Sequence, residues 1–553
     1  MKSEMCLDGL WDFEFFEHEK WNAVNPEAIR YPEKIMVPGC FDAMPGFENK
    51  KGTGVFRRFI SCGGNIKLDF EATGINGTVL WDGETVGVLD MPYTPFSFTF
   101  FAGEKGLHEL IVMTDNIITA ADDSIFSPFY DFHPFGGIYH SVKLRELPER
   151  YIDHVEVIPQ DLKTGKVLVK AELKGMDTES VEVCFDTGSG TEKFPVEQGK
   201  CEFYCNVPDF KIWSPENPEL HTLTLSIPGD SYSVEFGLRT IECKDGKILL
   251  NGEPLRLVGW NRHESYPAFG AAVPELLTYT DLQMIKRQGC NFVRGSHYKQ
   301  SDAMLRICDR LGLLVWEESL GWGNRAEQLA NPAFRDFQKR QTLAMVRSSI
   351  NHPCVIMWGF LNECASDTEA GRECIAELCK VVKEADPSRP VTFASCRMEK
   401  DIALDLVDII AFNTYPGWYD YSEEETEGLP RVAVKLKELA EFASREEYRS
   451  KPFIIGEIGA AAIIGDHSGG PWSEEYQADL LEIAVRSVFS NPRYSGLTMW
   501  LFANAKTYNH TWGSVLRPRG YNNKGAVDEF RRPKLSWTRI TEVLRELRES
   551  SGK

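Results

Sequence analysis

The hydrophobic pattern of this 553-residue chain changes once, near residue 242, and that change limits the folds it can adopt. Before residue 242, short apolar or alternating segments are separated by Gly, Pro, Asp and Asn, a pattern typical of strands and turns. After it, helical periods alternate with short apolar runs to the end of the chain. A chain of this length also exceeds what one hydrophobic core supports. The sequence therefore predicts several domains, first all-β and then α/β.

The all-β part divides into two predicted sandwiches at the linker Pro148-Glu149-Arg150. Residues 1–147 carry long aromatic and β-branched segments, which favour a jelly-roll β-sandwich of the sugar-binding type. Residues 148–241 carry shorter, alternating segments, which favour an immunoglobulin-like β-sandwich. The clearest expected strands are at 11–16, 55–60, 77–81, 109–113, 152–157, 167–173 and 223–227.

Residues 242–553 are predicted to form a (β/α)8 TIM barrel, because helices and strands alternate over the whole segment. The expected helices are at 279–288 and 300–311, and the expected strands at 312–316, 355–358, 409–412 and 453–455. A doubly wound open sheet is the competing architecture. Such sheets often carry a glycine-rich phosphate loop after a strand, and no such loop follows any predicted strand here.

Composition argues against several function classes. The net charge of −21 disfavours binding to a polyanion such as nucleic acid. No apolar run approaches the roughly 20 residues that span a bilayer, and the N-terminus lacks the apolar segment of a secretory signal. The 14 cysteines include no Cys-x-x-Cys pair, which indicates free thiols in a reducing compartment rather than a disulfide framework or a zinc site. We therefore expect a cytoplasmic protein with no metal.

Two predicted strands end in a glutamate: residues 355–363 end in Glu363, and residues 453–457 end in Glu457. The carboxyl ends of the strands carry the chemistry of a TIM barrel. A carboxylate at the end of an apolar strand loses solvation unless it is paired or used. For one such glutamate, structural pairing explains the pattern equally well. Two in one barrel favour a catalytic role.

Glycosidic cleavage requires two carboxyl groups. One is protonated and gives its proton to the leaving oxygen, while the other is ionised and attacks the anomeric carbon. Glu363 and Glu457 are 94 positions apart (457 minus 363), about three β/α units, which is compatible with strands 4 and 7 across the barrel mouth. Retaining glycosidases hold such a pair about 5–5.5 Å apart.

The residues around these glutamates resemble glycoside hydrolase family 2, and within it the bacterial β-glucuronidases, over nearly the whole chain. Five stretches carry the resemblance: Asn351-His352-Pro353 leading to Asn362-Glu363; Gly456-Glu457-Ile458-Gly459; Leu250-Asn251-Gly252-Glu253-Pro254 running to Arg262-His263-Glu264; Arg294-Gly295-Ser296-His297-Tyr298; and Trp213-Ser214-Pro215-Glu216-Asn217-Pro218. The predicted order of domains is also that of the family. The resemblance implies that Glu363 is the general acid/base and Glu457 the nucleophile.

The string Asn522-Asn523-Lys524-Gly525 indicates whether the bound sugar is a uronic acid or a neutral sugar. It resembles the Asn-x-Lys-Gly signature with which β-glucuronidases bind the sugar carboxylate. A lysine supplies a compact charge and three donors, and the asparagine amide adds a neutral donor beside it. The same string is also typical of a solvated turn. Its position after Trp500, in register with the family, favours the binding role.

The resemblance also implies which other residues bind the sugar. Asp131 matches a jelly-roll loop residue that reaches the barrel mouth, and Trp500 matches an aromatic floor for the sugar ring. Arg517 lies near an arginine that the family places beside the carboxylate. The remaining implied substrate-binding residues are His263, Asn362, Asn413, Tyr415 and Tyr419, in addition to Asn522 and Lys524. For the aromatic residues, ordinary core packing is the alternative.

Four residues depart from the family pattern near the sugar site. Cys364 stands where Pro is usual, Ile458 where Tyr is usual, Lys299 where Pro is common, and Asn504 where Asp is usual. Relative to the family pattern, one residue is also inserted between Arg517 and Asn522. These departures leave both glutamates intact, and they leave the preference at the sugar 4-position open.

The sequence therefore predicts a retaining exo-glycosidase that releases a terminal β-D-glucuronic acid from a small-molecule or oligosaccharide substrate. A β-galacturonidase, or an enzyme that accepts both epimers, is the first alternative. A β-galactosidase and a non-catalytic carbohydrate-binding protein on the same scaffold are further alternatives. The Asn522/Lys524 pair argues against the former, and the two glutamates argue against the latter. No cofactor is expected, and the family resemblance implies a homo-oligomer.

Overall fold

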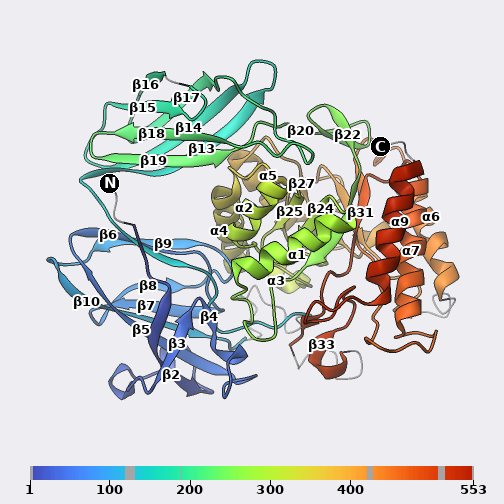
Figure 1. Ribbon diagram of the computed structural model, residues 1–553, viewed down its shortest axis with the longest axis horizontal. Helices are drawn as coiled ribbons and strands as arrows, with labels where there is room; N and C mark the ends of the chain where they lie inside the picture. The colour runs from blue at the N-terminus through green and yellow to red at the C-terminus, as the bar shows by residue number, and fades with distance from the viewer. Residues whose placement is uncertain (1–3, 119–130, 189, 420–427, 509–516, 551–553) are drawn as a thin grey trace.

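The computed structural model describes residues 4–118, 131–188, 190–419, 428–508 and 517–550, and these form three groups of sheets (Figure 1). The first group is blue in Figure 1 and lies at the lower left, and the second is teal to green and lies at the upper left. The third is a parallel barrel with its helices, at the centre and right.

Two antiparallel sheets form the first group, in the strand orders β3-β2-β5-β10-β7-β8 and β1-β12-β6-β9. Their inner faces enclose one apolar core, to which Trp11, Phe13 and Phe56 belong. The strands are β1 (Glu4–Cys6), β2 (Gly9–Glu17), β3 (Glu33–Val37), β5 (Gly52–Cys62), β6 (Asn65–Phe70), β7 (Asn76–Trp81), β8 (Glu84–Leu89), β9 (Phe96–Phe101), β10 (Gly106–Asp115) and β12 (Val142–Glu146). A small separate sheet pairs β4 (Gly39–Cys40) with β11 (Gly137–Ile138).

The second group is also a two-sheet sandwich, in the strand orders β13-β14-β17 and β16-β15-β18-β19. Burial alternates along β18, so that one face of the strand packs into the core and the other lies toward solvent. The strands are β13 (Arg150–Asp161), β14 (Lys166–Gly175), β15 (Ser180–Phe185), β16 (Thr191–Pro195), β17 (Lys200–Asn206), β18 (His221–Ile227) and β19 (Asp230–Phe236). We propose domain boundaries near residues 147 and 241, in the connections that separate the three groups.

A parallel sheet in the order β27-β26-β25-β24-β23-β31-β30-β29-β28 forms the third group. β27 (Val391–Thr392) and β28 (Ala394–Ser395) are separated only by Phe393, and they close the sheet on itself by pairing with β26 and β29. With these two counted as one, the nine strands make the eight positions of a TIM barrel. The other barrel strands are β23 (Leu257–Arg262), β24 (Phe292–Gly295), β25 (Leu314–Glu318), β26 (Val355–Gly359), β29 (Ile410–Asn413), β30 (Phe453–Glu457) and β31 (Gly496–Met499).

Helices follow the barrel strands along the chain. They are α1 (Glu275–Gln288), α2 (Asp302–Leu311), α3 (Ala326–Ala330), α4 (Pro332–Ser349), α5 (Glu369–Ala385), α6 (Leu429–Ala443), α7 (Glu474–Ser490) and α9 (Leu535–Ser550). A short antiparallel sheet of β20 (Ile241–Lys244), β21 (Lys247–Leu250) and β22 (Glu253–Leu255) precedes the barrel. At the far end of the chain, β32 (Ala505–Lys506) pairs with β33 (Tyr521–Asn522).

The predicted fold class is confirmed, and several predicted element boundaries are wrong. The helix predicted at 300–311 begins at Asp302, and the strand predicted to end in Glu363 ends at Gly359. The first barrel helix begins at Glu275 rather than at 279, directly after Pro274. The strand predicted at 312–316 is β25, which begins two residues later and ends at Glu318. Gly312 is not part of it, because this residue caps α2 in the left-handed conformation, with φ of 66°.

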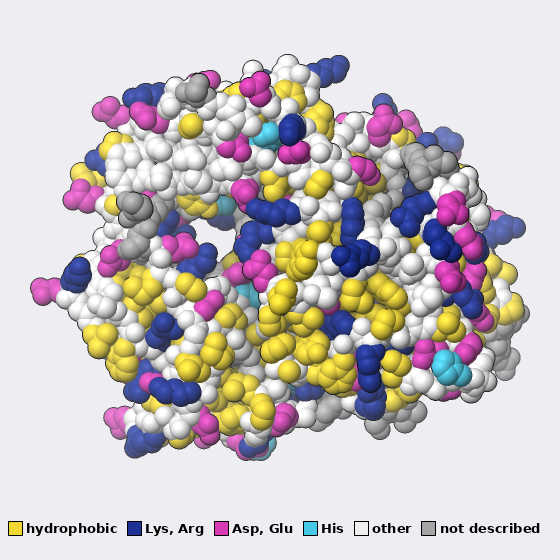
Figure 2. Space-filling model, in the orientation of Figure 1, with side chains coloured by type: hydrophobic (Ala, Val, Ile, Leu, Met, Phe, Trp, Pro, Cys, Tyr) yellow, Lys and Arg dark blue, Asp and Glu magenta, His cyan; other side chains and the backbone are white. Residues whose placement is uncertain are grey.

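None of the described helices is long and apolar enough to cross a membrane. All 14 cysteines are free thiols. On the face shown in Figure 2, acidic and basic side chains are interspersed.

Candidate active site

The carboxyl ends of the fourth and seventh barrel positions carry the two predicted catalytic glutamates. Glu457 is the last residue of β30 and is buried. Glu363 follows the end of β26, and both Leu361 and Glu363 adopt positive φ, 52° and 53°. Residues other than glycine rarely adopt this conformation, which costs on the order of 1–3 kcal/mol each. The turn after β26 lets the Glu363 carboxyl reach Asn413 of β29.

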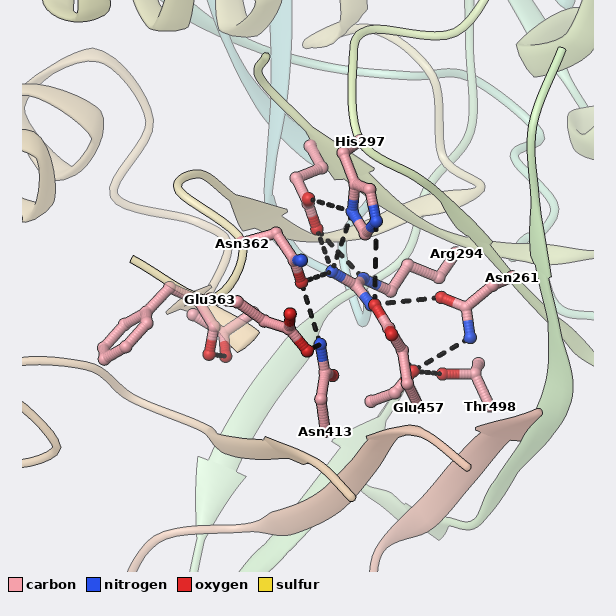
Figure 3. Close-up of polar contacts among 12 residues, drawn as sticks. Asn261, Arg294, His297, Asn362, Glu363, Asn413, Glu457 and Thr498 are labelled. Atoms are coloured by element: carbon pink, nitrogen blue, oxygen red, sulfur yellow. Dashed lines mark hydrogen bonds and ion pairs between the residues drawn. The ribbon is translucent and has the colours of Figure 1, made fainter. Parts of the chain in front are cut away.

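Arg294 of β24 holds the Glu457 carboxylate. Its Nη1 donates to Glu457 Oε1 at 2.7 Å. Its Nε and Nη2 donate to Glu318 Oε2 at 2.9 and 2.8 Å. The side chains of Arg294 and Glu318 are fully buried, and that of Glu457 is 4% exposed. Figure 3 shows Arg294 at the centre of this network, so that one buried guanidinium is shared between two carboxylates.

Asn362 and Asn413 connect Arg294 to Glu363 (Figure 3). Arg294 Nη2 donates to Asn362 Oδ1 at 2.8 Å. Asn413 Nδ2 donates to Asn362 Oδ1 and to Glu363 Oε1, each at 2.9 Å. Asn362 Nδ2 and Asn413 Oδ1 are buried, and within the described parts of the chain they have no hydrogen-bond partner. Because buried polar atoms are nearly always paired, these two atoms are candidates for ligand contacts.

Burial raises the pKa of both predicted catalytic carboxyls. That of Glu457 rises to about 8, against the opposing effects of Arg294 and Tyr415. That of Glu363 also rises, and Asn413 opposes the rise. The pair therefore shares a proton near neutral pH. Glu457 accepts from a guanidinium and a phenol, which stabilise an anion, whereas Glu363 accepts from the neutral amide of Asn413. The geometry thus favours the proton on Glu363.

A second cluster lies beside the pair, around the buried amine of Lys524. Its Nζ donates to Tyr419 Oη at 2.5 Å and lies 4.5, 5.3 and 5.8 Å from the ring centroids of Tyr419, Tyr415 and Trp418. No carboxylate of a described residue forms an ion pair with this amine. Burial, and then the charge of Arg517, lowers the pKa of Lys524 well below its usual value. Among the residues that the structure describes, the cluster therefore contains a buried amine with no carboxylate partner.

Tyr415 joins this cluster to the pair Glu363 and Glu457. Its hydroxyl donates to Glu457 Oε2 at 2.5 Å, while its ring faces Lys524 Nζ. Burial, and then the charge of Glu457, raises the pKa of Tyr415 well above its usual value, so the phenol keeps its proton and remains a donor. Tyr415 thus fixes the distance between the nucleophile candidate and the cation.

Asp131 lies on the other side of the Lys524 cluster. Arg517 Nε and Nη2 donate to its two carboxylate oxygens, each at 2.6 Å, and Asn522 Nδ2 donates to Oδ2 at 2.7 Å. Arg517 Nη2 also lies 3.3 Å from Tyr419 Oη. The bidentate pair makes Asp131 and Arg517 a rigid unit. Asp131 therefore accepts hydrogen bonds from protein donors, in addition to the sugar contacts that the sequence predicted for it.

The backbone near Lys524 explains the glycine of the Asn-x-Lys-Gly string. A Cβ at Gly525 would lie 2.2 Å from the backbone nitrogen of Asn504 and 2.3 Å from the carbonyl oxygen of Val527. No side chain fits there without moving the backbone. The side chain of Asn523 points away from the cluster, since its amide donates to the carbonyls of Pro518 and Tyr521.

Aromatic and imidazole rings form a third part of the site. The ring of His297 stacks on Trp500 at 5.2 Å, and the ring of His263 meets Trp500 edge-on at 5.4 Å. Both nitrogens of His263 are buried, and neither has a partner within the residues described. Burial lowers the pKa of His263 well below its usual value, so this ring is neutral. It offers one donor and one acceptor to a ligand.

The first sandwich holds the loop that carries Asp131. Asp42, which is fully buried, accepts from His133 Nε2 at 2.8 Å and from the backbone nitrogen of Gly136 at 3.0 Å. The pairing of β4 with β11 fixes the end of the same loop. Residues from the first sandwich and from the barrel therefore meet at one site.

The structure brings all the predicted site residues into one region. They are Asp131, His263, Asn362, Glu363, Asn413, Tyr415, Tyr419, Glu457, Trp500, Arg517, Asn522 and Lys524. Arg294, His297 and Glu318 belong to the same network, although the sequence pattern assigned them no role. The sequence does carry a signal for two of them, because Arg294 and Glu318 are charged residues near the ends of apolar strands.

Family models match two segments of the chain. Residues 150–239 match the model "Glycosyl hydrolases family 2", and residues 241–515 match "Glycosyl hydrolases family 2, TIM barrel domain". The β-glucuronidase of Streptococcus agalactiae is 29% identical over 96% of this chain and 94% of its own length. The β-glucuronidase of Rattus norvegicus is 32% identical over 80% of this chain, which spans 70% of that protein. The chain spans 63% of the β-glucuronidase of Sus scrofa.

Solved structures give the same family. The β-galacturonidase of Eisenbergiella tayi, solved bound to galacturonate, is 34% identical with a TM-score of 0.89, covering 99% of this chain and 97% of its own. The β-glucuronidase of Bifidobacterium dentium, complexed with coumarin-3-O-glucuronide, is 24% identical with a TM-score of 0.88, covering 98% and 97%, and shows the shared fold. On the two family models and the relatives of 30% identity or more, the chain belongs to glycoside hydrolase family 2 and is a glycoside hydrolase.

Proposed function

We propose that this protein is a retaining exo-β-uronidase that hydrolyses terminal β-D-glucuronides. One observation carries the proposal: the buried Lys524 amine, without a carboxylate partner among the described residues, lies beside the buried Glu457 and the partly buried Glu363. A uronic acid supplies the missing anion in its C6 carboxylate. A neutral sugar leaves the buried cation uncompensated, which costs binding energy.

In the proposed first step, a Glu457 oxygen forms a bond to the anomeric carbon while the glycosidic carbon–oxygen bond breaks. The Glu363 proton goes to the leaving oxygen, and Glu363 becomes a carboxylate. In the second step Glu363 takes a proton from water, whose oxygen attacks the anomeric carbon and releases Glu457. The unpaired atoms Asn362 Nδ2 and Asn413 Oδ1, and the His263 ring, are proposed to bind sugar hydroxyls.

A β-galacturonidase, or an enzyme that accepts both epimers, is the second candidate. The observation that favours it is the Eisenbergiella tayi β-galacturonidase, which is 34% identical over 99% of this chain. The curated relatives at 29–32% identity are β-glucuronidases. The two sugars differ only at the 4-hydroxyl, so the proposed carboxylate contact serves both. Initial rates on paired nitrophenyl glucuronide and galacturonide decide between them.

The free cysteines support the prediction of a reducing, cytoplasmic compartment. The homo-oligomer implied by the family resemblance stays a prediction, and sedimentation equilibrium of the purified chain measures it.

Replacing the acid/base should affect substrates according to their leaving groups. Without the Glu363 proton, the leaving group of an alkyl uronide must depart as an unprotonated alkoxide, which is slow. A nitrophenolate is a weak base and leaves without being protonated. We expect Glu363→Ala to slow alkyl uronides at least about 10²-fold more than dinitrophenyl uronide, in line with the usual size of acid catalysis. Azide, which needs no general base, should then yield the β-glycosyl azide.

Glu317→Gln is the matched control for this variant. Glu317 is buried and also lies at a strand end, but its Oε1 accepts from the backbone nitrogen of Gln300 rather than from the catalytic network. It should keep the wild-type ratio between the two substrates. An equal loss on both kinds of leaving group, or an α-azide product from Glu363→Ala, counts against the acid/base assignment.

Activity should depend on pH through the shared proton. The active form carries one proton on the pair, so kcat/KM should fall on the acid side when a second proton binds and on the basic side when the last one leaves. Because burial raises both pKa values, and that of Glu457 to about 8, the basic limb should lie near pH 8. A pH–rate profile on a nitrophenyl uronide measures this. A basic limb near 4.5, the ordinary pKa of a glutamate carboxyl, contradicts it.

A further inference from the structure

Glu318 takes part in the catalytic network without contacting either Glu363 or Glu457 in any hydrogen bond of the described structure. Its Oε2 accepts from Arg294 Nε and Nη2, and its Oε1 lies 3.0 Å from His297 Nδ1. As a carboxylate only accepts, the His297 Nδ1 carries the hydrogen. Although burial works in the opposite direction, Arg294 and then His297 hold the pKa of Glu318 below its usual value. Glu318 is therefore an anion at neutral pH.

The charge around Arg294 changes during the proposed reaction. In the free enzyme the guanidinium faces two carboxylates, Glu457 at 2.7 Å and Glu318 at 2.8 Å. When Glu457 becomes a neutral ester, it no longer neutralises Arg294. The Arg294 side chain is fully buried, so solvent cannot take over that role. Glu318 is then the carboxylate that remains paired with this cation.

We propose that Glu318 is a positioning residue that stabilises the covalent glycosyl-enzyme by neutralising Arg294 after Glu457 has been esterified. In the free enzyme, the Glu318 charge also weakens the stabilisation of the Glu457 carboxylate by Arg294, because the guanidinium is shared between the two carboxylates. Glu457 is therefore more basic and a better nucleophile. The inference rests on the proposed function, because it needs Glu457 as the nucleophile.

Removing the charge of Glu318 should therefore change the rates of formation and of hydrolysis of the covalent intermediate in opposite directions. In Glu318→Gln the covalent intermediate leaves a buried cation unpaired, so the intermediate should form more slowly and break down faster. Loss of a nearby negative charge also lowers the pKa of Glu363 and Glu457, so the pH–rate profile should move toward acid. A purely structural defect would slow both steps and leave the profile in place.

The test uses a 2-fluoro-uronosyl fluoride, which traps the covalent intermediate of a retaining uronidase. For Glu318→Gln we expect labelling at least about tenfold slower than in wild type, because an unpaired buried charge is costly. Recovery of activity after removal of excess reagent should be faster than in wild type. Glu318→Asp keeps the charge and should restore the pH profile, and Glu317→Gln should resemble wild type in both rates. Melting temperatures check that each variant is folded.

The outcomes are distinguishable. Equal slowing of labelling and recovery in Glu318→Gln, or unchanged rates, overturns the role of Glu318 while the proposed function stands. The role of Glu318 is likewise overturned if Glu318→Asp shifts the pH profile as Glu318→Gln does. If the wild-type protein is never labelled, or is labelled on a carboxyl other than Glu457, the proposed function fails and the inference fails with it.

Discussion

Glu457→Ala should lower kcat on a nitrophenyl uronide by at least about 10⁴-fold, as expected when the nucleophile of a covalent mechanism is removed. The carboxylate of Glu457 has no substitute in the described network, since Glu318 is turned toward Arg294 and His297. Azide can occupy the space that the truncated side chain leaves. It should restore turnover by attacking the anomeric carbon from the same side, giving the α-glycosyl azide.

The melting temperature of a Glu457 variant distinguishes a loss of catalysis from a loss of folding. The pKa values of Glu363 and Glu457 are both raised in the folded protein, that of Glu457 to about 8 from its ordinary value of 4.5, so the folded pair binds one extra proton between these values. Wild-type stability is therefore lost as the pH rises through this window. Glu457→Gln removes one of the two carboxylates that cause this loss, so at high pH, above the folded-state pKa, its melting temperature should equal or exceed the wild-type value. A variant that is inactive and also unstable at every pH would point to a structural role.

Lys524→Met should cost on the order of 10²-fold or more in kcat/KM on uronides, the size expected for losing a charge-assisted hydrogen bond. The slow background rate on the matching neutral glycosides should hardly change, because they have no carboxylate to lose. Burial lowers the pKa of Lys524 well below 10.5, so the charged amine destabilises the folded protein. Its removal should keep or raise the melting temperature, most at low pH, where the amine is charged.

Asn523→Ala is the matched control for this prediction, and Asn522→Ala is a second test of it. Asn522→Ala removes a side chain that bonds Asp131, so its loss should also be selective for uronides. Asn523→Ala removes a side chain bonded to the carbonyls of Pro518 and Tyr521, away from Lys524, so it should lower stability and affect all substrates alike. Equal losses on uronides and neutral glycosides in Lys524→Met would contradict the carboxylate contact. Glucuronides and galacturonides should fall together, because both carry the carboxylate.

Glu363 and Glu457 could be proposed as the catalytic pair from the sequence because carboxylates that follow apolar strands stand out in the hydrophobic pattern. Glu363 and Glu457 lie at the fourth and seventh barrel positions, as predicted. Glu318 was missed because the third strand was placed two residues too early. Gly312 looks like the start of an apolar run in the sequence, whereas in the structure it caps α2.

The arrangement around Lys524 could not be derived from the pattern. Asp131 and Arg517 are 386 positions apart, and no period or spacing relates a loop of the first sandwich to the end of the barrel. Family resemblance selected the residues, and the structure supplied their contacts. It showed in particular that Asp131 is held by Arg517 and Asn522, and that Tyr415 joins Lys524 to Glu457. Such partners are set by tertiary packing.

The central claim is that Glu457 becomes covalently linked to a uronic acid, and one measurement tests it directly. The wild-type protein is incubated with a 2-fluoro-β-glucuronosyl fluoride, digested, and mapped by mass spectrometry. We expect one added fluorouronosyl group, carried by the peptide that contains Glu457 and located on its side chain. We also expect no labelling by the neutral fluoroglucoside under the same conditions. A label on another carboxyl, or labelling by the neutral reagent alone, would contradict the central claim.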